Sequence, residues 1–393
     1  MAVSIKDLQA TTSGQGRRVD ISASAAQRMP AVKVWAGIGA AFVALWAYVL
    51  VTWVTSDYFK AVPKGVSDVP GWMATELIGW QVISIPIALL LLERFVIRTW
   101  RRERHIGIDG LLVLAFATLW PQDLLSNFNG GYFVYNSSML NFGSWANAVP
   151  GWMSFGRPGA MTSEPILFTP AAYVYCCLAG TFFGAWAMRR TKRRFPDVGT
   201  LGLLGGCFSA LVVFDIVIEG VLWMPLGIYE YPGGHWALFG DTYHKYPVNE
   251  TITLAAAFTG LSSLKYFLDD RGRSIAERGI DQVRGPMSGY KVALRAFAVI
   301  GAVQILFLVF YNIPNVIIGM KADTWPKDLQ ERSYFTNGLC GAGTDRLCPV
   351  NGKINLPRQD APYVNSNRGV TVPEGFSFPT IAPFGRGATG GGS

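Results

Sequence analysis

Long apolar stretches recur along this chain, and they restrict its fold more than any other feature. Several run for roughly 18 or more residues with few charges, enough to cross a hydrocarbon layer about 30 Å thick as a helix. Half of the 393 residues are hydrophobic and only 15% are charged. Lipid offers no hydrogen-bond partner to an open strand, so such segments must be helical. We therefore predict an all-α, polytopic membrane bundle with seven transmembrane helices, at residues 32–54, 72–97, 107–126, 165–188, 200–225, 251–268 and 290–319.

The distribution of Lys and Arg between the loops predicts the orientation. Basic residues gather in four places, with counts of 5, 5, 5 and 7: the N-terminal segment and residues 94–104, 189–194 and 265–295. The three intervening loops hold four in total: Lys60, Lys64, Arg157 and Lys245. Under the positive-inside rule the four rich segments are cytoplasmic. With seven spans, the N-terminus then lies in the cytoplasm and the C-terminus outside an inner or plasma membrane.

The same clusters account for the net charge of +8 and the isoelectric point near 9.2. In a soluble protein such a charge would suggest nucleic-acid binding. Here the basic residues are expected to meet anionic lipid headgroups, so membrane lipids rather than nucleic acid are the predicted partners.

Two polar segments flank the predicted bundle. Residues 1–31 lack an apolar core, so we expect a cytoplasmic segment and no cleavable signal peptide. Residues 320–393 are rich in Pro, Gly and Asn without a helical or strand period, and such a segment cannot build its own core. We expect this extracytoplasmic tail either to be disordered or to lie over the external mouth of the bundle. Its last residues, GATGGGS, resemble a linker.

The five cysteines divide by position. Cys176, Cys177 and Cys207 lie in predicted spans, where a small apolar thiol is unremarkable. Cys340 and Cys348 flank a glycine-containing loop in the predicted external tail. Because extracytoplasmic compartments favour oxidation, we predict a disulfide between these two.

An ionisable group inside a predicted span needs a partner or a function, and three carboxylates from two of the spans are singled out. Asp215 and Glu219 are four residues apart and therefore share a helix face. Asp123, in the third span, lies at a similar depth near the external side. We predict that these carboxylates converge near the external mouth and form a catalytic group.

The predicted external loops add acidic, aromatic and amide side chains. We predict an outward-facing, electronegative cavity whose substrate-binding residues are Tyr135, Asn136, Trp145, Tyr231, His235 and Glu250. No cofactor is predicted. A single metal ion remains an alternative, with His235, His244 and Asp241 as its ligands.

Each of these residues also has a structural interpretation. Glu164, Glu219 and Glu250 could mark helix ends at the water interface, and two of them suit a helix N-terminus. Asp123 and Asp215 could hydrogen-bond between helices. The histidines could be ordinary interfacial residues. A functional site is favoured by the gathering of all these groups on one side of the membrane.

The chemistry predicted for such a site is acid catalysis. A desolvated carboxyl group crowded by others keeps its proton and serves as a general acid, while a neighbour stabilises developing positive charge. The sequence contains no Walker A, GxSxG, HExxH or CxxCH motif, and no Rossmann fingerprint that follows a predicted strand. ATP-driven transport, nicotinamide chemistry, serine hydrolysis and thioether-linked haem therefore have no support.

Three segments carry a family resemblance. Residues 128–152 read FNGGYFVYNSSMLNFGSWANAVPGW, Glu164 and Pro165 follow, and residues 219–250 read EGVLWMPLGIYEYPGGHWALFGDTYHKYPVNE. Together they resemble the AveC-like spirocyclase family of actinobacteria, over roughly residues 35–320. The resemblance implies a helical membrane fold and acid-catalysed cyclisation, because the family takes its name from a polyketide-pathway member that forms a spiroketal.

Two main functions follow from these observations, and transport of a lipid or small molecule is a third alternative with little support. The first is a membrane-embedded cyclase or dehydratase acting on a lipophilic polyketide, terpenoid or lipid, with Asp215 as the leading general acid and Glu219 and Asp123 tuning it. The second is a non-catalytic accessory subunit of a larger membrane or envelope complex, with the external tail as a docking arm for a partner.

Overall fold

The computed structural model describes residues 30–127, 131–151, 162–358 and 361–376. Within them the chain is mainly helical, and five helical stretches are long and apolar enough to cross a membrane. These stretches are Ala31–Val54, Gly71–Glu103, Thr169–Arg194, Thr200–Trp223 and Lys291–Gly319. A helical membrane protein, as predicted, is therefore supported by length and composition.

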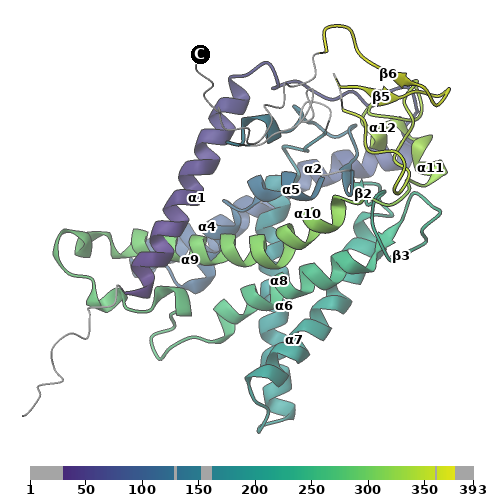
Figure 1. Ribbon diagram of the computed structural model, residues 1–393. Coiled ribbons are helices and arrows are strands. Elements are labelled where there is room, and N and C mark those ends of the chain that lie inside the picture. Colours follow the sequence, from purple (N-terminus) through teal and green to yellow (C-terminus); the bar gives the residue numbers. More distant parts are fainter. Residues whose placement is uncertain (1–29, 128–130, 152–161, 359–360, 377–393) are drawn as a thin grey trace, which may run out of the picture.

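The five stretches are built from α-helices, some joined by π-helical turns (Figure 1). They are α1 (Ala31–Val54); α2 (Gly71–Leu92), π-helix η1 (Glu93–Ile97) and α3 (Arg98–Glu103); α6 (Thr169–Arg194); α7 (Thr200–Asp215) and π-helix η5 (Ile216–Trp223); and α9 (Lys291–Phe307), π-helix η9 (Leu308–Asn312) and α10 (Ile313–Gly319).

Two of the seven predicted spans are not among these five stretches. The span predicted at 107–126 is broken into α4 (Ile108–Phe116), a 3-10 turn (Trp120–Gln122) and α5 (Leu124–Asn127). Pro121 explains the break, because its ring clashes with the carbonyl four residues earlier and removes a helical hydrogen bond. The span predicted at 251–268 is α8 (Val248–Tyr266), which is long enough but contains Glu250, Lys265 and several hydroxyl groups. The count of seven spans stays a prediction.

Close helix contacts depend on glycine. Helices α1 and α9 pack along each other, and Gly39 and Gly301 lie at their crossing. A Cβ at Gly39 would lie 1.9 Å from the Phe297 carbonyl oxygen, and one at Gly301 would lie 2.3 Å from that of Trp35. Small residues at such positions let membrane helices approach closely. Helices α6, α7 and α8 also pack on one another and lie together in Figure 1.

Short strands and turns form a cap at the end of the bundle near β2. The antiparallel pairs are β1 (Val134–Tyr135) with β2 (Tyr229–Glu230), β3 (Ala237–Leu238) with β4 (Tyr246–Pro247), and β5 (Tyr363–Val364) with β6 (Val370–Thr371). In the first pair Tyr135 lies opposite Tyr229. This register brings two aromatic side chains together beside the helices.

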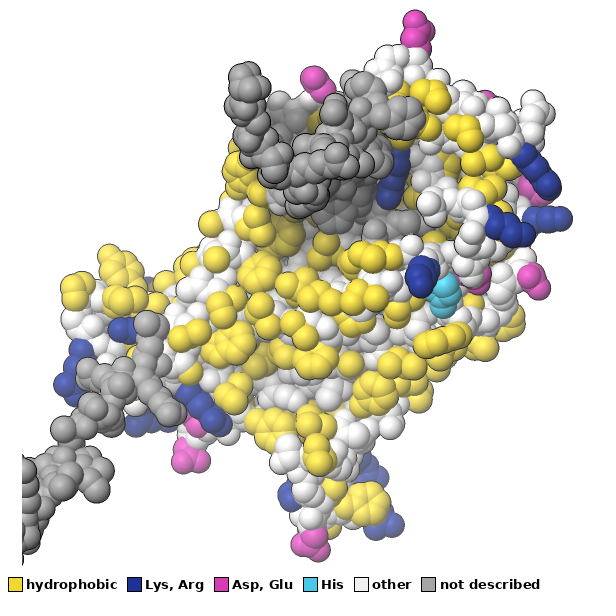
Figure 2. Space-filling model, in the orientation of Figure 1, with side chains coloured by type: hydrophobic (Ala, Val, Ile, Leu, Met, Phe, Trp, Pro, Cys, Tyr) yellow, Lys and Arg dark blue, Asp and Glu magenta, His cyan; other side chains and the backbone are white. Residues whose placement is uncertain are grey.

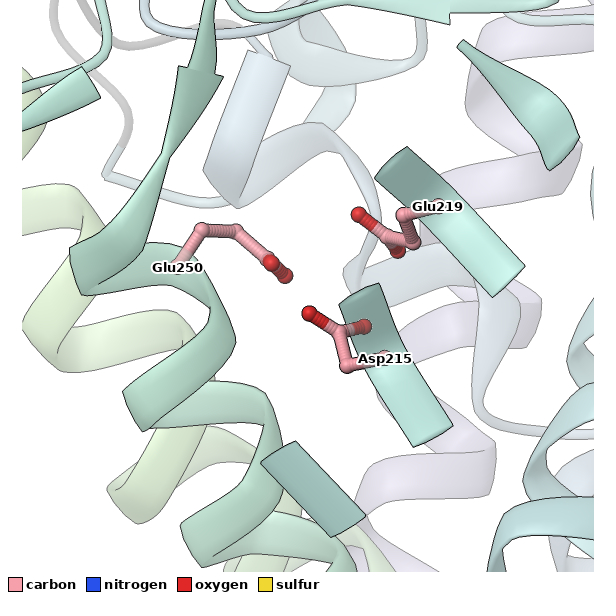
Figure 3. Close-up of side chains that lie close together, drawn as sticks. All are labelled: Asp215, Glu219 and Glu250. Atoms are coloured by element: carbon pink, nitrogen blue, oxygen red, sulfur yellow. The ribbon is translucent and has the colours of Figure 1, made fainter. Parts of the chain in front are cut away.

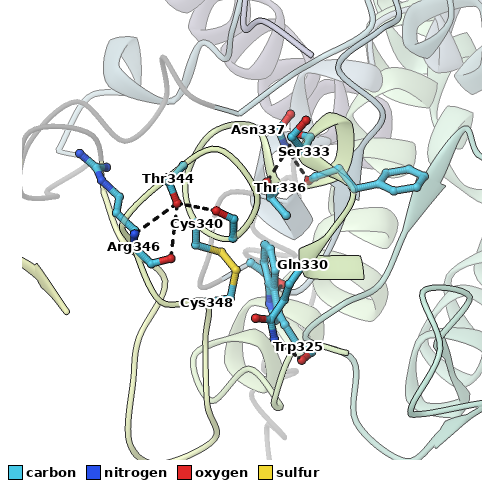
Figure 4. Close-up of a disulfide and its surroundings, with 12 residues drawn as sticks. Trp325, Gln330, Ser333, Thr336, Asn337, Cys340, Thr344, Arg346 and Cys348 are labelled. Carbon is cyan, nitrogen blue, oxygen red and sulfur yellow. Dashed lines mark hydrogen bonds between the residues drawn. A yellow bond between two sulfur atoms is a disulfide. The ribbon is translucent and has the colours of Figure 1, made fainter. Parts of the chain in front are cut away.

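The described part of the tail packs into this cap. It contains α11 (Lys327–Gln330) and α12 (Ser333–Thr336), and Trp325 and Phe335 are buried in the same hydrophobic cluster as Tyr132 and Tyr229. The predicted disulfide between Cys340 and Cys348 is present, and Figure 4 shows it beside Trp325 and Gln330. Of the two arrangements considered for the tail, these residues adopt the one that covers the bundle.

A buried ion pair anchors the basic segment at the other end. Arg295 of α9 donates to the Glu277 carboxylate at 2.7 Å, and Glu277 also closes a capping box with Ser274. Between the two ends, Figure 2 shows hydrophobic side chains over the middle of the visible face, with charged side chains mainly at its margins. This distribution suits a protein that meets lipid around its waist.

Removing the disulfide should loosen the cap. The bridge closes a loop with a sequence separation of 8, and loop-closure entropy assigns such a bridge about 2.5 kcal/mol. In the double variant Cys340→Ala/Cys348→Ala, we expect limited proteolysis between residues 320 and 376 to be at least roughly tenfold faster than in wild type. Cys176→Ala, which removes a free thiol, is the matched control. Equal cleavage rates in the double variant and the control would contradict this view of the cap.

Candidate functional site

A small internal cavity lies where the helices meet the cap. It encloses about 90 Å³, room for a few water molecules. Its walls come from α6, α7, η5, α8, α9, η9 and both strands of the β1–β2 pair. The polar side chains in its lining are mostly carboxyl and phenol groups: Asp123, Tyr135, Tyr173, Asp215, Glu219, Tyr229, Tyr231 and Tyr311.

Three carboxylates form one cluster beside this cavity. Asp215, Glu219 and Glu250 each offer an oxygen such that all three atoms lie within 4.8 Å of one another. All three residues are buried. Figure 3 shows the Glu250 carboxylate extending from α8 toward the Asp215 and Glu219 side chains. We call these residues the carboxylate triad.

Local backbone structure explains how two members of the triad share one face. Helix α7 ends at Asp215 and continues as the π-helix η5, which contains Glu219. Short π-helical segments widen a helical turn and are frequent at functional sites. Glu250 comes from the first turn of α8, where a carboxylate is favoured by the helix dipole.

Hydroxyl groups hold two of the three carboxylates. Tyr231 donates to Oε2 of Glu219 at 2.9 Å, and Tyr246 donates to Oδ2 of Asp215 at 2.9 Å. The Tyr246 hydroxyl also lies 2.5 Å from that of Thr251. Among the residues that the structure describes, no well-formed hydrogen bond reaches either carboxylate oxygen of Glu250.

The triad cannot carry three negative charges. At an effective dielectric constant of about 20, two ionised carboxylates at this separation repel each other by roughly 3 kcal/mol, and burial adds a desolvation cost. The triad must therefore hold protons or a cation. As an all-oxygen ligand set it would suit a hard divalent ion such as Mg²⁺ or Ca²⁺.

Asp123 forms a second acidic centre on the same cavity. Tyr173 of α6 donates to its Oδ1 at 2.8 Å, and Tyr135 and Glu164 also interact with this carboxylate. Asp123 and the two α7–η5 carboxylates thus line one cavity, but Asp123 and the triad have different tyrosine partners. The site has two acid–tyrosine centres facing one space.

One known protein family matches more than half of the chain. The family model described as Spirocyclase AveC-like matches residues 100–335. The chain belongs to this family. The AveC-like region contains both acidic centres and extends into the tail as far as α12. No curated protein and no solved structure matches the chain.

Two other residues predicted for the site, Asn136 and Trp145, lie elsewhere. The Asn136 amide donates to the Gly227 carbonyl oxygen at 3.0 Å. The Trp145 indole donates to the Pro121 carbonyl oxygen at 2.9 Å and packs against Trp53 and Trp120. Neither lines the cavity, and these contacts indicate structural roles.

The alternative metal ligands are not gathered together. His235 contacts the Lys321 carbonyl oxygen, His244 pairs with Glu230, and Asp241 is exposed. In the described part of the chain, the triad is where three candidate ligands of this kind meet.

Several functional candidates escaped the sequence analysis. Tyr173, Tyr246 and Tyr311 either bind a carboxylate of the site or line the cavity. Tyr173 and Tyr311 lie inside apolar helices, and a hydroxyl group there needs a partner just as a carboxylate does. That requirement was the available indication for these two tyrosines.

Beside the candidate site, the buried Glu230 carboxyl group pairs with the partly exposed side chain of His244. Their Oε1 and Nδ1 atoms lie 2.8 Å apart. Burial raises the pKa of Glu230 well above its usual range, and burial lowers the pKa of His244 to about 4. Both pKa shifts favour a pair in which Glu230 keeps its proton and donates to a neutral His244 imidazole.

This pair predicts that the folding stability of wild type and that of Glu230→Gln depend differently on pH. Above about pH 4.5 the unfolded chain releases the Glu230 proton while the folded chain retains it, so wild type loses up to about 1.4 kcal/mol of stability per pH unit. Gln keeps a donor without this loss. We expect the melting temperature of Glu230→Gln to rise relative to wild type between about pH 5 and about pH 8.

His244 contributes the opposite slope between about pH 4 and its ordinary pKa of 6.5, but it is present in both proteins and largely cancels. Glu331→Gln is the control, because the Glu331 side chain is exposed. A constant difference in melting temperature between Glu230→Gln and wild type across this range would show that Glu230 is ionised in the folded protein.

Proposed function

We propose that this chain is a membrane-embedded enzyme that catalyses acid-assisted cyclisation or dehydration of a lipophilic polyketide, terpenoid or lipid. The supporting observation is the pair of acid–tyrosine centres on one buried cavity. Membership of the spirocyclase AveC-like family supports the same reaction class.

The proposed reaction needs one proton donor and one proton acceptor. A carboxylic acid of the triad, led by Asp215, protonates the hydroxyl of a hemiketal. Water leaves, and a ring oxocarbenium ion forms. A second hydroxyl of the substrate then adds to this carbon and gives its proton to a carboxylate, and transfer of a proton from that group back to the triad regenerates the acid. In dehydration, the same carboxylate removes a proton from the carbon next to the cation instead.

The two centres divide these roles in the proposal. The triad supplies the proton because its crowded carboxyl groups must retain protons in the absence of a cation. Asp123, held by Tyr173, accepts the proton from the attacking hydroxyl or carbon. The tyrosines keep each carboxyl group oriented toward the cavity, and their rings exclude bulk water from the cation.

Cavity size limits which part of the substrate enters. Sites that enclose a drug-sized ligand measure roughly 300–1,000 Å³, whereas this one encloses about 90 Å³. The proposal therefore places the reacting ring atoms in the cavity and the remaining apolar chain outside it.

Neutralising the acidic centres should abolish catalysis. The assay follows spirocyclisation of an alkyl-substituted dihydroxyketone and measures the enantiomeric excess of the product, because the uncatalysed reaction gives a racemate. We expect Asp215→Asn, Glu219→Gln and Asp123→Asn each to lower kcat by about 10²–10⁴-fold. Glu76→Gln, on an exposed position of α2, should retain wild-type turnover. Wild-type turnover in all three carboxylate variants would eliminate the site assignment.

An accessory role remains the competing proposal, and the tail is the feature that bears on it. A docking arm needs free surface, but Trp325, Phe335 and Leu339 are buried against the chain's own cap. The enzymatic proposal is therefore preferred.

We also propose the topology inferred from the basic loops, with the cytoplasmic side at residues 189–194 and the tail outside. Thiol labelling with an impermeant maleimide on intact cells tests it. Asn367→Cys, on an exposed tail position, should be labelled, and Asp197→Cys, on an exposed loop position, should react only after lysis. The reverse pattern would invert the topology.

A further inference from the structure

A second hollow, distinct from the buried cavity, lies on the side of the bundle. It measures about 530 Å³ and runs between the π-helix η5 and the β3–β4 hairpin. Its lining includes the apolar residues Ile216, Val221 and Leu238 and the polar residues Thr242, His244 and Asp328. We call it the lateral groove.

The lateral groove opens where lipid is expected. One wall belongs to the candidate membrane span Thr200–Trp223, at the end away from the basic loop 189–194. On this helix Val213, Val217 and Val221 are 59%, 51% and 66% exposed, as expected for side chains that face acyl chains.

Exposed aromatic residues of the β3–β4 hairpin lie at the same end of the bundle as the lateral groove. Trp236 and Phe239 are 76% and 72% exposed, and both have positive φ angles. Exposed aromatic side chains at the end of a membrane span are typical of the headgroup interface. The groove therefore lies at the boundary between acyl chains and headgroups.

One tyrosine connects the lateral groove to the carboxylate triad. Tyr246 lines the groove, and its hydroxyl donates to Asp215 inside the bundle. Gly220 allows the ring to lie against η5, since a Cβ there would come within 3.2 Å of it. The Tyr246 side chain thus contributes to both the groove wall and the triad.

We propose that the lateral groove binds the alkyl chain of an oxygenated, uncharged amphiphile drawn from the membrane, with its oxygenated end directed past Tyr246 toward the triad. The groove volume falls within the usual range for a ligand of this size, and the small inner cavity accepts the reacting end alone. The reaction at the oxygenated end rests on the proposed function, whereas binding of the alkyl chain in the lateral groove does not.

Photoaffinity labelling tests the groove directly. The probe is a long-chain alcohol with a diazirine in its chain, added to the full-length protein in lipid nanodiscs, and labelled peptides are mapped by mass spectrometry. We expect label on residues 216–225 and 237–246, displaced by excess unlabelled alcohol. Val221→Trp fills the groove and should lower labelling at these positions roughly tenfold.

The matched control is Val217→Trp. Val217 is on the same helix and is also exposed to lipid, but it does not line the groove, so labelling should stay at the wild-type level. Leu238→Trp fills the groove from the opposite wall and replaces Val221→Trp if that variant fails to fold. Undiminished labelling in a folded groove-filling variant, or equal labelling of all lipid-facing helices, would overturn the proposal.

The two proposals fail in different ways. Asp215→Asn should retain labelling while losing turnover. If turnover persists in every carboxylate variant but Val221→Trp still loses label, binding in the lateral groove is supported and the catalytic assignment is wrong. If the carboxylate variants lose turnover but Val221→Trp changes neither labelling nor KM, the proposed binding in the lateral groove is wrong and the catalytic assignment is supported.

Discussion

Carboxyl groups taken out of water must be neutralised, and this requirement governs the interior of the protein. Asp215, Glu219 and Glu250 lie close together with little access to solvent. The hydrogen bonds to two of them come from tyrosine side chains, which are neutral donors and do not cancel charge. A bundle that had only to fold would be more stable with apolar residues here. The loss of folding stability caused by this cluster is consistent with a site where protons are transferred or a cation is bound.

The elements around the cluster are arranged to meet that requirement. Two of the three π-helical segments described, η5 and η9, contribute Glu219 and Tyr311 to the cavity. The β1–β2 pair adds Tyr135 and Tyr229 from the cap. Regular α-helices supply the membrane-crossing framework, and departures from regular structure occur where side chains must be aimed inward.

Much of this arrangement was predictable from the sequence, and the limits have physical causes. Asp215 and Glu219 could be placed on one face because a four-residue spacing is local. Glu250 was assigned to substrate binding, since its approach to Asp215 depends on how α8 packs against α7, which no local pattern encodes. Trp145 was also assigned to substrate binding, and the hydrogen bond from its indole to the Pro121 carbonyl oxygen likewise depends on packing that no local pattern encodes.

The cap shows how the tail and the chemistry are connected. Tyr231 and Tyr246, which hold Glu219 and Asp215, belong to the segment between η5 and α8. Next to Tyr246, the buried ammonium of Lys245 donates to the Asp323 carboxylate at 2.9 Å and to the carbonyl oxygens of Pro232 and Thr324. These bonds join the tyrosine-bearing segment to the start of the tail.

The tail beyond Asp323 is fixed in turn. The Trp325 indole donates to the Gly131 carbonyl oxygen at 3.1 Å, and the Cys340–Cys348 bridge lies in the same buried cluster. A loose tail would free Asp323 and leave the Lys245 charge buried without its partner, which is strongly unfavourable. The segment carrying Tyr231 and Tyr246 would then have to move. The tail is therefore best understood as part of the structure that orients the acidic site, although none of its described residues lines the cavity.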